Sequence, residues 1–280
     1  MIRIITDSTC DLSKDLIKEF NIEIIPLYVT FNDDSYKDGI EINSEKLYKE
    51  VDKRKMLPKT SAASMLDFMN YFKNIIDNGD EAFYVGIGSK LSTTLNNANM
   101  AIEELGTDKI MTADSKNLST GISLLVLKAC KDRDNGLSLK EIKENADKNA
   151  DKVLAQFAIE STEFLRKGGR CSSIASLAAT VLRIKPIIEV REGMLSVGKK
   201  PIGKIKRAID MMNNQIMDDK DNVDNDFIFV THSYQDDGAK YIIPILKEEF
   251  PNARIVETSA GCVISSHCGK GTIGILYMLK

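Results

Sequence analysis

Short apolar runs alternate with stretches of helical periodicity along the first half of the chain. The apolar runs at residues 3–5, 22–31, 82–88 and 109–112 predict strands, the second of them broken at Pro26. Between and after these runs, apolar residues recur at three- and four-residue spacing, which predicts helices over residues 14–20, 44–53, 64–76, 93–105, 119–130 and 138–153. Strands that alternate with helices of this length indicate a Rossmann-like parallel sheet covered by helices.

The pattern changes after about residue 155. Glu192-Gly193 separates two apolar runs and suits a hairpin turn, so this half contains at least one antiparallel pair. Strands are predicted at residues 155–159, 185–191, 194–197, 227–231, 254–258 and 273–279. Helices are predicted at residues 172–182, 205–218 and 237–250. The sequence therefore predicts an α/β protein of two domains, a parallel N-terminal domain (1–158) and a C-terminal α/β domain with a mixed sheet (159–280).

Two segments are expected to be a loop and a linker. They are residues 32–42, which are acidic, and the stretch around Pro58, which leads to Lys59-Thr60-Ser61. Residues 262–272 are assigned no helix or strand and lead into a glycine-rich turn. Gly168-Gly169 is expected to end a short helix.

The stretch from residue 82 to residue 105 combines a buried strand, a turn of small residues and a helix that Ser92 is expected to cap. Free N–H groups and the positive end of the helix dipole attract anions at such a position. The turn adds hydroxyls at Ser89, Ser92, Thr93 and Thr94. These could hold a carboxylate or phosphate, although an ordinary helix cap needs only one of them. The loops that hold Ser8, Ser92 and Ser115 are expected to share one sheet edge.

Composition narrows the class of protein. A net charge of −3 argues against a nucleic-acid partner, and no apolar run is long enough to cross a membrane. The first apolar run leads directly into Thr6-Asp7-Ser8, so we interpret it as a strand and not as a signal peptide. Five cysteines without a Cys-x-x-Cys pair indicate reduced thiols and a cytoplasmic protein. Cys262, His267 and Cys268 match no standard zinc spacing, so no metal is expected.

Motifs for hydrolysis and nucleotide binding are incomplete. Gly86-Ile87-Gly88-Ser89 places its serine one position too late for a nucleophile elbow, and residues 269–272 hold phosphate-loop residue types in the wrong order. His267 lies between Ser266 and Cys268, a setting in which its ring could neutralise or hydrogen-bond a carboxylate.

A family resemblance covers the whole chain. Each motif is weak alone, but their order resembles the DegV family of bacterial fatty-acid-binding proteins. The motifs are Asp7-Ser8-Thr9, Lys59-Thr60-Ser61, Ser89-Lys90-Leu91-Ser92, Asp114-Ser115, Leu165-Arg166-Lys167-Gly168-Gly169-Arg170, Lys185-Pro186 and His267-x-Gly269-x-Gly271.

This resemblance implies a fatty acid buried between two domains, with no further cofactor. Its carboxylate is expected to contact Thr60 and Ser92, with His267 close by and with Ser61 and Thr93 as neighbouring hydroxyls. The resemblance also implies a partner, a fatty acid kinase that makes acyl phosphate at the exposed head group. Arg170 is implicated in that step by the resemblance, and Lys199 and Lys200 either meet the kinase or form an ordinary basic loop.

The chain departs from the usual family pattern at three places. Ala62-Ala63 stands where Gln-Pro is common, Thr93 where glycine is common, and Lys270 where proline is frequent. The first two could alter head-group geometry or chain preference.

The tail of the acid needs an apolar tunnel. Its predicted lining is either Phe68, Met69 and Phe72, or residues 172–182 with Ile187 and Ile188, although such stripes are more often plain core.

Three functions remain open from the sequence. The leading hypothesis is a carrier without catalytic activity that binds a long-chain fatty acid. The second is an acyl or lipid hydrolase that uses Ser92 and His267, and the third is a sensor of a non-lipid anion.

Overall fold

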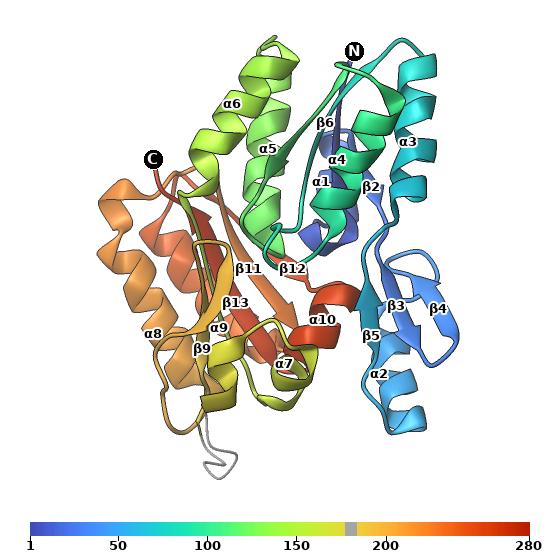
Figure 1. Ribbon diagram of the computed structural model, residues 1–280. Coiled ribbons are helices and arrows are strands. Elements are labelled where there is room, and N and C mark those ends of the chain that lie inside the picture. Colours follow the sequence, from blue (N-terminus) through green and yellow to red (C-terminus); the bar gives the residue numbers. More distant parts are fainter. Residues whose placement is uncertain (177–183) are drawn as a thin grey trace.

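A computed structural model describes residues 1–176 and 184–280, which form three β-sheets and the helices around them (Figure 1). The first sheet has the strand order β2-β1-β6-β7, and every neighbouring pair is parallel. The predicted parallel N-terminal sheet is therefore confirmed. Its strands are β1 (Ile2–Asp7), β2 (Ile22–Ile25), β6 (Glu81–Gly86) and β7 (Ile110–Asp114).

The helices around this sheet follow the predicted periodicity. In α3, for example, Phe68, Phe72 and Ile75 form the buried face, and Ser64 with Asp67 forms a capping box at the amino end. The five helices are α1 (Lys14–Glu19), α3 (Met65–Asp77), α4 (Thr94–Leu105), α5 (Thr120–Asp134) and α6 (Leu139–Ala150).

The second sheet is mixed, as predicted, with the order β10-β9-β8-β13-β11-β12. Only its β11–β12 pair is parallel. Its strands are β8 (Val153–Ala158), β9 (Ile187–Arg191), β10 (Met194–Val197), β11 (Phe227–Ser233), β12 (Arg254–Ser259) and β13 (Thr272–Met278). Helices α8 (Ile205–Asp218) and α9 (Asp236–Glu249) pack on one face of it.

Short 3₁₀ helices occur at Ser8–Cys10, Ser172–Ser176 and Lys220–Asn222. The helix predicted over residues 172–182 is therefore a 3₁₀ turn at its start, and residues 177–183 lie outside the described part of the chain.

A small antiparallel sheet, β4-β3-β5, corrects two predicted loops. Its strands are β3 (Tyr28–Phe31), β4 (Asp34–Lys37) and β5 (Lys59–Ser61). Strand β4 is mostly exposed and polar, so it carries no alternating apolar signal. Helix α2 (Ser44–Arg54) follows it and is capped by Asn43.

Two short helices lie between the sheets. Helix α7 (Glu163–Gly168) ends at Gly169 in a left-handed conformation, as predicted. Helix α10 (Cys262–Cys268) forms where the sequence predicted no element. Its first N–H groups, those of Cys262 and Val263, donate to the carboxylate of Asp38 at 2.9 and 3.1 Å. Because this cap comes from a distant part of the chain, no local signal announces the helix.

Helix α5 packs against β1 and β6 of the first sheet and against β8, β11 and β13 of the second. One apolar core accordingly runs through both halves. Strand β8 precedes the predicted boundary at residue 158, yet it is hydrogen-bonded in the second sheet between β9 and β13. This pairing favours a boundary before Val153, and the division into two domains stays a prediction.

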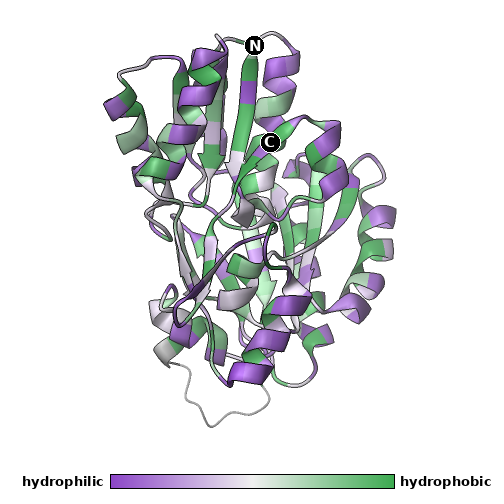
Figure 2. Ribbon diagram, turned by 90° about the vertical axis from the view of Figure 1, so that its right-hand side faces the viewer, coloured by the Kyte–Doolittle hydropathy of each residue, from purple (hydrophilic) through white to green (hydrophobic). Residues whose placement is uncertain are grey.

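Apolar residues gather on the strands, while most helices turn a polar face outward (Figure 2). None of the helices in the described residues is long and apolar enough to cross a bilayer.

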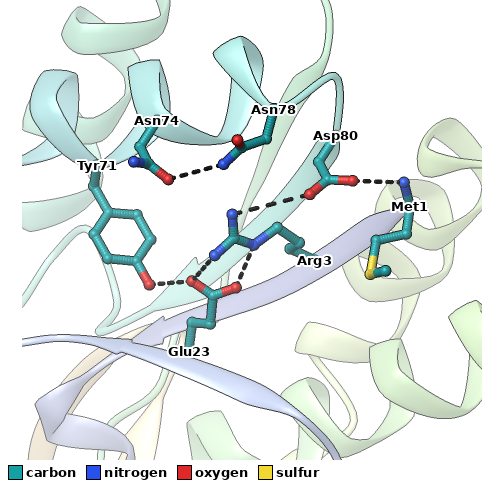
Figure 3. A network of polar contacts seen from close by, with 7 residues as sticks. All are labelled: Met1, Arg3, Glu23, Tyr71, Asn74, Asn78 and Asp80. Atoms are coloured by element: carbon teal, nitrogen blue, oxygen red, sulfur yellow. Dashed lines mark hydrogen bonds and ion pairs between the residues drawn. The ribbon is translucent and has the colours of Figure 1, made fainter.

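A polar network closes the first sheet at the amino ends of its strands (Figure 3). Arg3 of β1 binds both carboxylate oxygens of Glu23 on β2, and Tyr71 of α3 donates to the same carboxylate. The terminal amine of Met1 binds Asp80 at 2.8 Å. The carboxyl ends of these parallel strands, where the functional site lies, are at the opposite edge.

Candidate functional site

A cavity of about 430 Å³ lies at the carboxyl edge of the first sheet and is called the head cavity below. It brings together Thr60, Ser61, Ser92, Thr93 and His267, all five residues predicted to surround a carboxylate. Arg170 lines it as well. Its other lining residues are Leu27, Ala62, Ile87, Ser89, Lys90, Leu91, Leu118, Leu195, Val263 and Ile264.

Strand β5 brings Thr60 into the head cavity. Thr60 pairs with Val29 of β3, and alternation along the strand leaves Lys59 and Ser61 exposed while Thr60 is half-buried. The strand was missed in the sequence because three residues are too few for an alternating pattern.

The loop after β6 carries the second group of hydroxyls, and the buried carboxylate of Asp7 holds this loop in place. Asp7 accepts hydrogen bonds from the N–H of Ile87 and the hydroxyl of Tyr84, each at 2.9 Å. A Cβ at position 86 would lie 2.1 Å from the same carboxylate, so the close approach requires Gly86. Asp7-Ser8-Thr9 thus acts through positioning and not through contact with the cavity.

The four hydroxyls of this loop have different partners. Ser89 donates to Asp114 at 2.5 Å, so its hydroxyl is already engaged. Ser92 Oγ accepts from the N–H of Thr94 at 3.3 Å and lies 2.7 Å from Thr94 Oγ1. Helix α4 begins at Thr94 with Thr93 as its N-cap residue, so the predicted cap at Ser92 is wrong by one position. Ser92 lies in the cavity wall before the helix, and when Thr94 Oγ1 donates in this pair, the hydroxyl proton of Ser92 is available to a ligand.

The serines of the other two predicted loops lie at the same sheet edge but do not line the cavity, although Leu118 of the Ser115 loop does. Ser8 Oγ accepts from the N–H of Leu27 at 3.1 Å, and Ser115 is buried beside Asn117.

His267 is fixed by its contacts with Thr60 and Gly168. Its Nε2 lies 2.7 Å from Thr60 Oγ1, while Nδ1 is buried without a hydrogen-bond partner among the described residues. Nδ1 faces Gly168, where a Cβ would lie only 2.3 Å away. A buried N–H without an acceptor is costly, so the geometry favours the proton on Nε2, which then donates to Thr60. The hydroxyl proton of Thr60 is left to point at a ligand.

The charge near the head cavity is positive. Burial and then the charge of Arg170 lower the pKa of His267 to about 4, so the imidazole is neutral at pH 7 in the free protein. Arg170 is exposed, and its guanidinium donates to the carbonyl of Gly168 at 2.8 Å. Lys90 also lines the cavity and donates to the carbonyl of Glu192 in the β9–β10 turn at 2.8 Å. Among the described lining residues none is acidic, so the cavity suits an anion.

A second, smaller cavity of about 50 Å³ continues from the first and is called the tail chamber. The two share the side chains of Leu118, Leu195, Ile264 and His267. The tail chamber is further lined by Ser119, Phe157, Leu165, Thr231, His232, Ser233, Ala260, Cys268, Thr272, Gly274 and Leu276.

The polar side chains around the tail chamber have partners in the protein. Thr231 Oγ1 lies 2.6 Å from Thr120 Oγ1 and 2.8 Å from Thr258 Oγ1. Ser119 donates to Asp11, and Ser233 lies 2.7 Å from the hydroxyl of Tyr48. Because these groups already satisfy one another, the chamber offers mainly apolar surface to an occupant.

The predicted tail-lining residues lie elsewhere. Phe68 and Phe72 are fully buried core residues, and Phe68 packs edge-on against Tyr84 beneath the first sheet. Neither they nor Met69, Ile187 and Ile188 are among the described residues of the two cavities. The walls of the two cavities come from loops, from helices α7 and α10 and from one sheet face, and these residues are too far apart in sequence for periodicity to reveal. Residues 177–182 of the predicted lining lie outside the described part of the chain.

Lys200, which was predicted to face a kinase, is exposed but does not line the head cavity. Lys199 lies in a separate surface hollow with Glu189 and Arg191.

The arrangement disfavours a serine hydrolase. His267 Nε2 is occupied by Thr60, Ser92 is bonded to Thr94, and no hydrogen bond joins Ser92 to His267 in the described structure. A nucleophile of this class needs a base at hydrogen-bond distance and a third group that orients the base. The described residues also hold no group of three His, Cys, Asp or Glu side chains placed for a metal ion.

Comparison with known proteins gives consistent relatives over the full length. A family model described as an uncharacterised protein of the DegV family matches residues 1–280. A DegV domain-containing protein of Clostridium acetobutylicum is 32% identical over 281 residues, covering 100% of this chain and 99% of its own. Two solved structures cover 100% of this chain and 99% of their own. The first, described as showing fatty acid binding of a DegV family protein from Thermus thermophilus, has a TM-score of 0.92 at 25% identity. The second, DegV from Bacillus subtilis, described as a fatty acid binding protein, has a TM-score of 0.86 at 26% identity.

Proposed function

The chain belongs to the DegV family, and on that premise we propose that it is a carrier that binds one long-chain fatty acid. The hydroxyls of Thr60 and Ser92 hold the carboxylate in the head cavity, and the acyl tail is buried beyond His267. The carrier presents the acid to a fatty acid kinase, which forms the acyl phosphate, and it performs no catalysis itself. We place this activity in the cytoplasm.

The observation that carries the proposal is the junction of two unlike cavities. Hydroxyls and cations surround the head cavity, whereas the tail chamber has apolar walls, and four side chains belong to both. A molecule that satisfies both must carry an anionic group at one end of an apolar body. The solved structures from Thermus thermophilus and Bacillus subtilis, both described as fatty-acid-binding, support the same chemistry.

The energetics also favour a lipid. Burial of each methylene contributes about 0.8 kcal/mol, so full burial of a 16-carbon acid gains on the order of 10 kcal/mol before ordering costs. Full burial requires the residues around the tail chamber to move apart, because the chamber has only about 50 Å³ free. The hydroxyls therefore orient the acid more than they hold it.

Presentation to a kinase requires access to the carboxylate. Ser61, Thr93 and Arg170 line the head cavity and are all exposed, which supports access from solvent to this end. We propose that Arg170 meets the kinase or its phosphate donor, and that Lys200 lies at the edge of the same contact.

The direct test is mass spectrometry of the purified protein, first under native conditions and then after organic extraction. We expect an adduct at one molecule per chain that extracts as a long-chain fatty acid. A protein that carries no adduct and takes up neither palmitate nor oleate would contradict the proposal. A phosphate retained in place of a lipid would favour the anion-sensor alternative.

A double substitution tests the head-group assignment. Thr60→Ala with Ser92→Ala should reduce the retained acid at least tenfold, because two donors to a charged group are lost. Circular dichroism and thermal unfolding should stay close to wild type, since both residues lie at the cavity surface. Unchanged retention would refute the roles of these two hydroxyls.

A further inference from the structure

One face of the second sheet forms the floor of the tail chamber. Phe157 of β8 lies directly opposite Gly274 of β13, and Leu276 follows two residues further along on the same face. The intervening residues of β13, Ile273 and Ile275, point to the opposite face and belong to the core with α8 and α9.

Gly274 lets its two neighbours approach each other. A Cβ at this position would lie 2.9 Å from the backbone oxygen of Gln156, 3.1 Å from the Cβ of Phe157 and 3.2 Å from the Cδ1 of Leu276. The side chains of Phe157 and Leu276 therefore flank the bare glycine, and a side chain at position 274 would displace them.

Buried side chains border this floor. The hydrogen bond between Thr231 and Thr120 joins β11 to the start of α5 at the chamber wall. Phe229, which lies opposite Leu276 in β11, is completely buried in the core on the same face and lines neither cavity. With about 50 Å³ free, the chamber has room for only a few atoms before such residues must move.

We infer that Phe157, Gly274 and Leu276 form the end wall that sets the length of the acyl chain. This inference rests on the proposed fatty-acid-binding function and adds to it the residues that determine chain specificity. Each further methylene that fits in front of the wall lowers the Kd of the acid about fourfold, and a methylene that finds no space adds no affinity.

The experiment is a competition among saturated acids. Delipidated protein is incubated with an equimolar mixture of lauric, myristic, palmitic, stearic and arachidic acids, and the bound acids are extracted and quantified by mass spectrometry. Phe157→Leu and Leu276→Ala should each raise the ratio of the longer to the shorter acids by at least fourfold. Gly274→Ala should shift the bound mixture toward shorter acids.

Phe229→Leu is the matched control. It makes the same substitution as Phe157→Leu, on the same sheet face but in β11, which β13 separates from β8, and outside the chamber. We expect its acid profile to equal that of the wild type, even if its thermal stability falls as far as that of Phe157→Leu.

The outcomes distinguish a failure of the end-wall inference from a failure of the proposed function. Unchanged profiles in both Phe157→Leu and Leu276→Ala, with normal total binding, would overturn the end wall and leave the carrier function intact. An equal shift in Phe229→Leu would also overturn it, because general loosening of the core would then explain the effect. A wild-type protein that binds none of the five acids would overturn the proposed function and this inference together.

Discussion

Replacing Thr60 by valine removes one hydroxyl and keeps a β-branched side chain that suits strand β5. In the structure this hydroxyl lies 2.7 Å from His267 Nε2 and is the only partner of that ring among the described residues. The substitution therefore has two effects, one on the bound acid and one on the free protein.

The effect on binding follows from the lost donor. A hydrogen bond to a charged group contributes about 1.5–3 kcal/mol, so we expect the Kd for palmitate to rise roughly 10- to 150-fold. The effect on stability follows from His267, whose two ring nitrogens would both lack a protein partner. A buried unpaired group costs about 1–3 kcal/mol, and the lower end applies because Nε2 borders a cavity that admits water.

The assay is calorimetric titration of delipidated protein with palmitate, together with urea unfolding in the absence of ligand. Thr60→Ser is the matched control, because it keeps the hydroxyl, and its Kd should stay within about threefold of wild type. If Thr60→Val binds palmitate as tightly as wild type, the Thr60 hydroxyl does not contact the carboxylate. The idea that His267 orients this hydroxyl toward the ligand is then refuted.

Three further predictions concern charge. Arg170→Ala should change the Kd for palmitate by less than about fivefold, because an exposed ion pair contributes at most about 1 kcal/mol. The same substitution should strongly reduce phosphorylation by an added fatty acid kinase. A large loss of palmitate binding would assign Arg170 to the pocket instead. The pKa of His267 in the folded protein is about 4, below the ordinary value of 6.5, so between these pH values the unfolded chain binds the proton more readily. Protonation of His267 should therefore lower the unfolding free energy of the ligand-free protein by up to roughly 3 kcal/mol as the pH falls from 6.5 to 4. Urea unfolding of wild type and His267→Gln at both pH values measures this as a difference in slope, and equal slopes would contradict it. Glu23→Ala should lower the unfolding free energy by about 1–3 kcal/mol, because Arg3 and Tyr71 lose a shared partner, while leaving palmitate affinity unchanged at the far edge of the sheet; a change in affinity would show that the two edges are coupled.

The extent to which the sequence predicts this structure depends on how local each determinant is. Helix α3 is predicted well because its capping residue and its apolar stripe both lie within the helix itself. Helix α10 is missed because its cap, Asp38, is supplied from more than two hundred residues away. Strand β4 is missed because its stability comes from pairing with β3 and not from burial of its own side chains.

The residues of the candidate site also differ in whether local sequence predicts them. Thr60, Ser92 and His267 are predicted from motifs, and the structure brings all three into one cavity. The tautomer of His267 was beyond prediction, because it depends on Gly168 in another helix. The lining of the tail chamber does not follow from periodicity, since Phe157, Leu195 and Leu276 meet only when β8, β10 and β13 assemble. The predicted lining by residues 172–182 stays a prediction, because residues 177–182 lie outside the described part of the chain.

The position of β13 has a consequence for how the protein is made. This strand is the last element of the chain, yet it lies between β8 and β11 near the middle of the second sheet. During synthesis, β8 and β11 leave the ribosome before the strand that joins them, so their inner edges stay unpaired until residues 272–278 emerge. The floor of the tail chamber, which β8 and β13 share, cannot exist before that moment. A nascent chain therefore cannot form the tail chamber early, and a chain truncated before Thr272 exposes two strand edges and is a target for chaperones and proteases.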